Sequence, residues 1–276
     1  MSRPAVSWLP VRFAASYERC GFPPLEDWLA RAYVLGLRQV ELPWSVLPGH
    51  TPEVLRAVSR RLDRHGLGVS AINCATQFAG PDPDVIHAAH FRALEAAKAA
   101  RAFGAPVLVV TAGSARPDVP VSDSVATAAE GIARMADEVD RLGVTPCLVN
   151  DTRPRGQSQG SVVARSEVFL DLLQRLSSAP VRVCFNTGSP LVSAQDPAEL
   201  LGSVIDRVAH VHIADRLPGG VHNTTCGQGA VEFEPLLRRL SEASYRGALC
   251  LEDDDPGGRT QASLTFLRER VAQTWR

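Results

Sequence analysis

The stretch VAHVHIAD, residues 208–215, has the pattern of a buried strand: mostly apolar, rich in β-branched residues, and polar where it ends at Asp215. A glycine-containing turn, CGQGA at 226–230, follows it. The next segment, EFEPLLRRLSEAS at 232–244, has leucines three and four positions apart, which is typical of an amphipathic helix. This part of the chain therefore predicts one strand, one loop and one helix.

The same unit recurs along the whole chain. Eight apolar, strand-like runs occupy residues 11–16, 38–43, 67–73, 106–112, 144–150, 181–186, 208–215 and 247–253. The segments between them carry apolar residues at helical spacing, and several end in glycine. Eight strand-then-helix units without a linker predict an α/β fold, a single (β/α)8 TIM barrel spanning residues 1–276.

An open, doubly wound sheet is the alternative α/β architecture. Such a sheet normally has a glycine-rich, phosphate-binding turn after its first strand. The corresponding segment here, ASYERCGFPP at 15–24, has one glycine and no such motif. The barrel is therefore the favoured prediction.

Composition narrows the classes of partner. The chain has 29 basic and 30 acidic residues and a net charge of −1, so no basic field favours nucleic acid. No apolar run approaches the roughly 18 residues of a membrane span, and the first residues lack the apolar core of a signal peptide. The six cysteines are scattered without a CxxC pair, which fits a reducing cytoplasm. We expect a cytoplasmic protein with a small-molecule substrate, and we leave a homo-oligomer open.

Polar residues stand where most of the predicted strands end. In a barrel these ends converge on one mouth, which is where the active site lies. A polar strand end is also common for structural reasons alone, so the set carries more information than any member. The residues that we expect to line the mouth are Glu41, Asn73, Asn150, Asp151, Asn186, His212, Asp215, His222 and Glu252.

Several motifs carry a family resemblance. In order they are LRQVELP, GLGVSAIN, DRLGVTPCLVN, FNTG, HVHIAD with its GQG turn, and YRGALCLED. Between about residues 11 and 270 the chain resembles the xylose isomerase-like TIM-barrel superfamily. That group includes sugar isomerases and epimerases, hydroxypyruvate isomerase, inosose dehydratase and the endonuclease IV nucleases.

The resemblance implies one divalent cation, typically Mn²⁺, Mg²⁺ or Co²⁺, held by a Glu, an Asp, a His or Gln, and a Glu on strands 5 to 8. His212 and Glu252 match the last two ligands. Asn186 stands at the Asp position. Val149 falls at the strand 5 Glu position, and a one-residue slip would place Asn150 there. The cofactor is therefore left open, with His212, Glu252 and Asn186 as the ligands if a cation binds.

These observations lead to three alternatives. The first is an isomerase- or epimerase-type enzyme that transfers a proton on a polyhydroxylated or keto substrate, with Glu252 and His212 catalytic. The second is a metal-independent lyase, dehydratase or cyclase, which the missing ligands suggest. The third is a non-catalytic barrel that serves as a binding subunit. The remaining mouth residues are expected to bind substrate. The endonuclease branch is excluded because it needs more metal ligands than this chain has.

Overall fold

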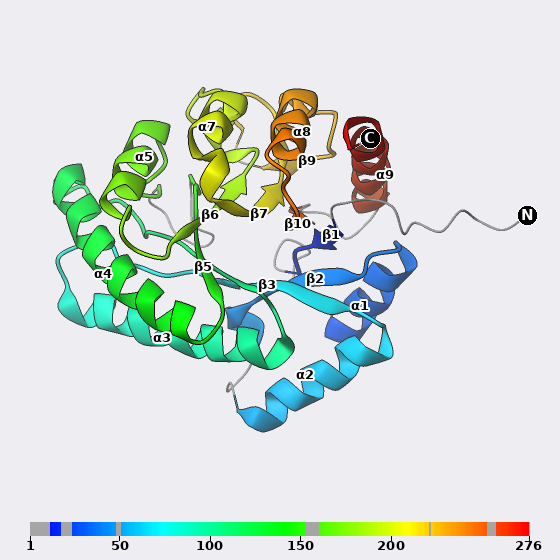
Figure 1. Cartoon of the computed structure of the whole chain (residues 1–276), viewed down its shortest axis with the longest axis horizontal. Helices are drawn as coiled ribbons and strands as arrows, with labels where there is room; N and C mark the ends of the chain where they lie inside the picture. The colour runs from blue at the N-terminus through cyan, green and yellow to red at the C-terminus, as the bar shows by residue number, and fades with distance from the viewer. Residues whose placement is uncertain are drawn as a thin grey trace, which may run out of the picture.

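The computed structural model describes residues 12–17, 24–47, 51–152, 160–220, 222–252 and 258–275, and it confirms the predicted barrel. Within these ranges, parallel strands form an eight-stranded sheet in the order β1-β10-β7-β6-β5-β4-β3-β2, and the helices surround it (Figure 1). The strands are β1 (Arg12–Ala15), β2 (Gln39–Pro43), β3 (Gly68–Cys74), β4 (Val107–Val110), β5 (Thr145–Val149), β6 (Arg182–Asn186), β7 (Val208–Ile213) and β10 (Ala248–Leu251).

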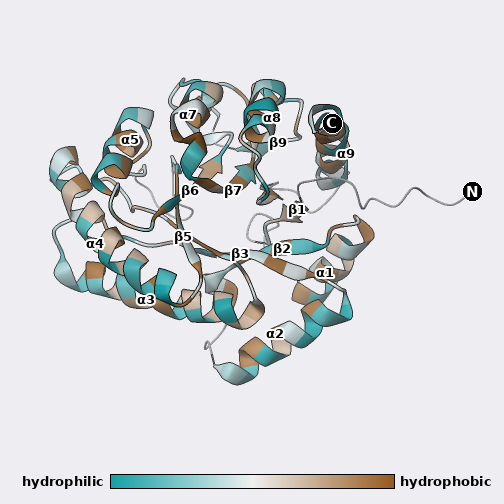
Figure 2. Ribbon diagram, viewed as in Figure 1, coloured by the Kyte–Doolittle hydropathy of each residue, from teal (hydrophilic) through white to brown (hydrophobic). Residues whose placement is uncertain are grey.

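The helices follow the strands in the expected alternation. They are α1 (Leu25–Val34), α2 (Pro52–Arg64), α3 (Pro83–Phe103), α4 (Val121–Arg141), α5 (Ser166–Arg175), α6 (Ser189–Val192), α7 (Pro197–Val204), α8 (Phe233–Glu242) and α9 (Gly258–Thr274). Short 3₁₀ turns lie at Trp44–Val46 and Ile205–Arg207. Hydrophobic and hydrophilic residues alternate along the outer helices, as amphipathic packing on a sheet requires (Figure 2). Among the described helices, none combines the length and the apolar character of a membrane span.

The barrel closes between β1 and β2. Ser16 forms a parallel bridge with Glu41, and the backbone N–H of Tyr17 donates to the Glu41 carbonyl at 3.1 Å. On the other side, the Ser16 N–H donates to the Leu251 carbonyl of β10 at 3.0 Å. This closure brings residues near the two ends of the chain to the same part of the mouth.

Strand alternation divides the core into two parts. Outward-facing strand residues join the helices in one large apolar cluster. A second, smaller cluster belongs to the interior of the barrel and contains Ala71, Val107, Val109, Cys147, Val149 and Cys184. Cys74, Cys147, Cys184 and Cys250 are free and buried.

The predicted strands differ from the observed ones only near their ends. The run 208–215 ends as a strand at Ile213, and Asp215 instead begins a two-residue strand, β8 (Asp215–Arg216), paired antiparallel with β9 (Asn223–Thr224). Val11 and Asp253, the outer ends of two predicted strands, lie outside the described residues. The loops after β1, β2, β5 and β10 also contain residues outside those ranges.

Candidate active site

His212 lies near the end of β7 between two carboxylates from distant parts of the sequence. Its Nε2 is 2.9 Å from Glu41 Oε2, and its Nδ1 is 3.1 Å from Glu252 Oε1. The three side chains are at most 4% exposed. Only an imidazolium can donate hydrogen bonds from both ring nitrogens, so this placement favours the charged form of His212.

The charge of His212 is set by competing effects. Burial alone would lower the pKa of His212, but Cys184, Glu41 and Glu252 together raise it well above its ordinary value. Because burial raises the pKa of the Cys184 thiol to about 11, that thiol is neutral and the two carboxylates hold the charge. Burial also opposes ionisation of Glu41, yet His212 and hydrogen bonds from His210 and His212 lower the pKa of Glu41 to about 2. Glu41 and His212 thus form a buried ion pair at neutral pH.

Asn186, the last residue of β6, holds Glu252 in place. Its Nδ2 donates to Glu252 Oε2 at 2.7 Å. Its Oδ1 accepts the backbone N–H groups of Gly188 at 3.1 Å and Ser189 at 3.0 Å. A carboxylate could cap this turn in the same way, but it has no hydrogen to donate to Glu252. The amide therefore allows Glu252 to accept hydrogen bonds from Asn186 and His212 together.

Asn150 and Asn73 support the site from neighbouring strands. Asn150 Oδ1 accepts the backbone N–H of Asn186 at 2.6 Å, and its Nδ2 donates to the Asn186 carbonyl at 3.1 Å. This side chain therefore extends the pairing of β5 with β6. Asn73 is half-buried, and its Nδ2 donates to Glu41 Oε1 at 3.3 Å. Both residues position other site residues.

Asp215, an expected substrate contact, has a different role in the structure. The side chain is fully buried, and its two oxygens accept the backbone N–H groups of Arg216, Gly227, Gly229 and Val231 at 2.9–3.0 Å. The carboxylate thereby holds the GQG turn against β8. All four hydrogen bonds are made to the chain's own backbone, so Asp215 has a structural role, and its contact with substrate stays a prediction.

The other expected substrate contacts lie at the rim. Asp151 is half-buried and lies two residues after the end of β5. His222 is exposed in the loop after β7, one residue before the buried Asn223. Asn223 Nδ2 donates to the Glu252 carbonyl at 2.5 Å, so this loop is tied to the end of β10. His222 thus lies on a loop anchored to the site.

His210 is a site residue that the sequence interpretation missed. Its Nε2 lies 2.9 Å from Glu41 Oε2, so Glu41 contacts two histidines. Burial lowers the pKa of His210, which favours a neutral ring that donates one N–H to the carboxylate. A signal was available in the sequence, because residues two apart on a strand face the same side, and His210 precedes His212 by two.

This protein has ionisable side chains at the C-terminal ends of the strands of a parallel α/β barrel. Active sites lie at the same place in TIM-barrel enzymes. The comparison with protein families makes this more specific. The chain belongs to the Xylose isomerase-like TIM barrel family, whose sequence profile matches residues 29–270.

Curated relatives have two kinds of activity in their names. A putative hydroxypyruvate isomerase from Streptomyces coelicolor is 25% identical over 254 residues, covering 86% of this chain and 89% of that protein. An inosose dehydratase from Clostridium botulinum is 29% identical over 115 residues, and the match covers 35% of this chain but only 39% of the dehydratase. Several other inosose dehydratases match to a similar extent.

Solved structures agree on the fold. A D-tagatose 3-epimerase-like protein has a TM-score of 0.83 at 17% identity, with 96% of this chain and 98% of that chain covered. An L-ribulose 3-epimerase has a TM-score of 0.81 at 16% identity, with 96% and 95% covered. At these identities the similarity establishes the barrel fold.

The residues at the family's cation positions do not fit that cation as they are arranged. Val149, at the strand 5 position, lies in the apolar interior cluster. At the strand 6 position, Asn186 directs N–H toward Glu252 while its oxygen accepts two backbone N–H groups. Both ring nitrogens of His212 face carboxylates. Hard cations need several oxygen ligands, which this set does not offer.

This disagreement gives a prediction for Asn186→Asp. The variant should lose about 1–3 kcal/mol of stability, because a carboxylate replaces the N–H that donates to buried Glu252. It should also gain a dependence on Mn²⁺, since the introduced carboxylate, Glu252 and His212 then form an oxygen-rich set. Thermal melts of the variant and the wild type, each with and without Mn²⁺, measure both effects. Equal stabilisation of the two proteins by Mn²⁺ would contradict the explanation.

Proposed function

We propose that this protein is an isomerase- or epimerase-type enzyme that acts by proton transfer on a small polyhydroxylated or keto substrate. One observation carries the proposal: Glu252 and His212 are in contact, at 3.1 Å, at the C-terminal ends of the barrel strands. A carboxylate is a suitable base for a C–H beside a carbonyl, and an imidazolium is a suitable hydrogen-bond donor to the carbonyl oxygen.

The reaction requires two shifts of electrons. Glu252 accepts the proton from the substrate carbon, and the electrons of that C–H bond form a C=C bond while the carbonyl oxygen gains negative charge. The substrate oxygen takes the place of Glu252 Oε1 as acceptor of the His212 Nδ1 hydrogen, and this hydrogen bond stabilises the enediolate. The hydroxyl proton of the deprotonated carbon then passes to the enediolate oxygen, and Glu252 returns its proton to the former carbonyl carbon, which interconverts an aldose and a ketose. Epimerisation would return a proton to the same carbon from its other face and needs a second acid.

Other buried groups position this pair. Glu41 accepts a hydrogen bond from His212 and is itself fully buried, so it orients the ring rather than touching substrate. Asn186 orients the Glu252 carboxylate in the same way. Asp151 and His222, at the rim, are the substrate contacts that we propose outside the pair.

A dehydratase is the second candidate function, favoured by the inosose dehydratase relatives. Loss of water begins with the same proton abstraction by Glu252. It differs in the second step, where the electrons expel a hydroxyl group from the neighbouring carbon and an acid protonates it. The same pair of residues can therefore serve either reaction, and the products distinguish them.

Exchange with solvent deuterium tests the proposal. We expect the wild-type protein in D₂O to replace a carbon-bound hydrogen next to the carbonyl of at least one member of a panel of ketoses, aldoses, hydroxypyruvate and inososes. Proton NMR follows the loss of the C–H signal and identifies an isomer or a dehydrated product. Folded protein that gives neither exchange nor product across the panel would contradict proton transfer and favour a binding role.

A further inference from the structure

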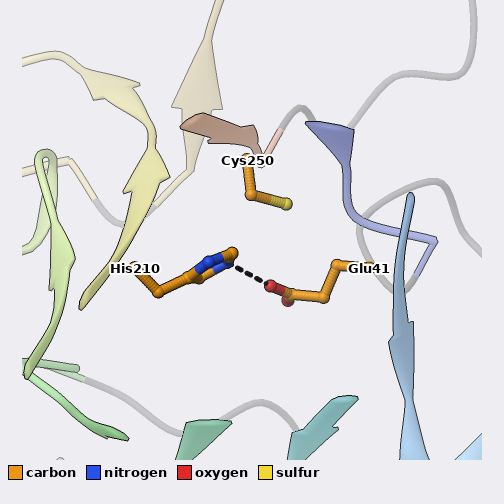
Figure 3. Close-up of side chains that lie close together, drawn as sticks. All are labelled: Glu41, His210 and Cys250. Atoms are coloured by element: carbon orange, nitrogen blue, oxygen red, sulfur yellow. Dashed lines mark hydrogen bonds and ion pairs between the residues drawn. The ribbon is translucent and has the colours of Figure 1, made fainter. Parts of the chain in front are cut away.

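Three side chains with metal-binding atoms meet inside the barrel: Glu41 of β2, His210 of β7 and Cys250 of β10. One ligand atom of each lies within 4.8 Å of the ligand atoms of the other two. They point toward one another from different sides of the barrel (Figure 3). Glu41 and Cys250 are fully buried, and His210 is 1% exposed.

We propose that Glu41, His210 and Cys250 bind one transition-metal ion of the Zn²⁺ type. Zinc takes carboxylate oxygen, imidazole nitrogen and thiolate sulfur at about 2.0–2.3 Å, so the ligand atoms of a tetrahedral site are about 3.3–3.8 Å apart. His210 Nε2 and Glu41 Oε2 are 2.9 Å apart as hydrogen-bond partners, so they separate by about half an ångström to bind the ion. Small side-chain shifts therefore convert the present cluster into three ligands around one ion.

The surroundings are suited to a bound cation. The ligands stand on three strands of one hydrogen-bonded barrel, which fixes their directions. Asn73 and His212 donate hydrogen bonds to the Glu41 carboxylate, as groups around metal ligands commonly do. Cys250 packs against Ala14 and Ala248, whose small side chains do not crowd the sulfur.

Charge and protons balance on binding. Ionised Glu41 and the Cys250 thiolate together balance the two positive charges of a divalent cation, so the ion and its three ligands are neutral as a group. The thiol of Cys250 releases one proton to solvent, and the hydrogen that His210 Nε2 donates to Glu41 in the metal-free protein moves to Nδ1, which leaves Nε2 free to bind.

This site is distinct from the cation site that the family resemblance implies. That site uses residues at the ends of β5, β6, β7 and β10, whereas Glu41 belongs to β2 and neither His210 nor Cys250 is at a family ligand position. A thiolate also selects zinc-like ions over Mg²⁺ or Mn²⁺. The proposal needs no assumption about the reaction, because it concerns binding alone.

Metal content and a cobalt spectrum test the proposal on the full-length wild-type protein. We expect about one equivalent of zinc in protein purified without chelator. After removal of that metal and loading with Co²⁺, a thiolate-to-cobalt charge-transfer band should appear in the near ultraviolet. If excess Co²⁺ gives no such band, the proposal is wrong, and this result requires no variant.

Two matched substitutions assign the band to a residue. Cys250→Ala should remove the band and most of the bound metal. Cys74→Ala makes the same change at another buried strand cysteine, one in the outer apolar cluster, and should keep both. Circular dichroism verifies that each variant is folded. Equal metal content and an equal band in the two variants would overturn the assignment. Neither readout uses turnover, so failure here is separate from failure of the proposed reaction.

Discussion

The Glu252→Gln variant should turn over substrate about 10²-fold or more slowly than the wild type, with its fold unchanged. Glutamine has nearly the shape of glutamate, but it cannot accept a proton from carbon at neutral pH. In the mechanism proposed above, every path to the enediolate passes through this carboxylate. The loss should therefore appear in kcat and in the deuterium exchange rate.

The local hydrogen bonds explain why the fold should survive. Glu252 accepts from Asn186 Nδ2 at 2.7 Å through Oε2 and lies 3.1 Å from His212 Nδ1 through Oε1. The glutamine oxygen can still accept from Asn186. Its NH₂ then faces His212 Nδ1, which accepts this hydrogen once the ring has lost its second proton. Glu252→Gln thus also makes His212 neutral, which adds to the loss of activity.

Glu138→Gln is a matched control. Glu138 also contacts a histidine, His90, at 3.0 Å, but it does so on the outer helices and is 42% exposed. This substitution should leave turnover unchanged. Wild-type activity in Glu252→Gln would show that the proton-transfer role, and with it this assignment of the site, is wrong.

Strand positions followed from the sequence because apolar runs and helical spacing are local signals. They placed the polar ends of β6, β7 and β10 on one mouth, and the family resemblance then singled out His212 and Glu252. No local signal in the sequence predicts the contact between Glu41 and His212, because closure of the barrel brings together residues that are 171 positions apart. The position of a residue at a strand end predicts where its side chain lies, but it does not predict which other side chain it contacts.

The roles of Asn186, Asn150 and Asp215 depend on which partner each side-chain atom hydrogen-bonds, and the position of a residue in the sequence does not reveal this. Asn186 has a donor and an acceptor, and only the structure shows that the donor faces Glu252. Asn150 was an expected substrate contact, yet both polar atoms of its side chain form hydrogen bonds with the backbone of Asn186 in β6. In the sequence Asp215 is one more polar residue at a strand end, and only the structure shows the four backbone N–H groups that donate to it.

The Asp215→Asn variant should lose about 3–5 kcal/mol of stability, because hydrogen bonds to a buried carboxylate contribute about 1.5–3 kcal/mol each. Oδ1 accepts from Arg216 and Val231, and Oδ2 accepts from Gly227 and Gly229. An asparagine replaces one oxygen with NH₂, which would face two N–H groups. The loop has little room to move away from the new NH₂ group, because it packs closely against residue 215. A Cβ on Gly229 would clash with Asp215 Oδ1.

Thermal melting measures this loss, and the expected decrease in Tm is roughly 6–15 °C for a domain of this size. Asp196→Asn provides the same chemical change at an exposed residue that caps α7 through a single hydrogen bond to Ala198 at 2.8 Å. Asparagine caps a helix as well as aspartate does, so that variant should melt within about 2 °C of the wild type. The GQG turn belongs to the loop that carries His222 and, through Asn223, contacts the end of β10. Equal Tm values for the two variants would mean that Asp215 does not hold this loop, and that its carboxylate is again a candidate for contact with substrate.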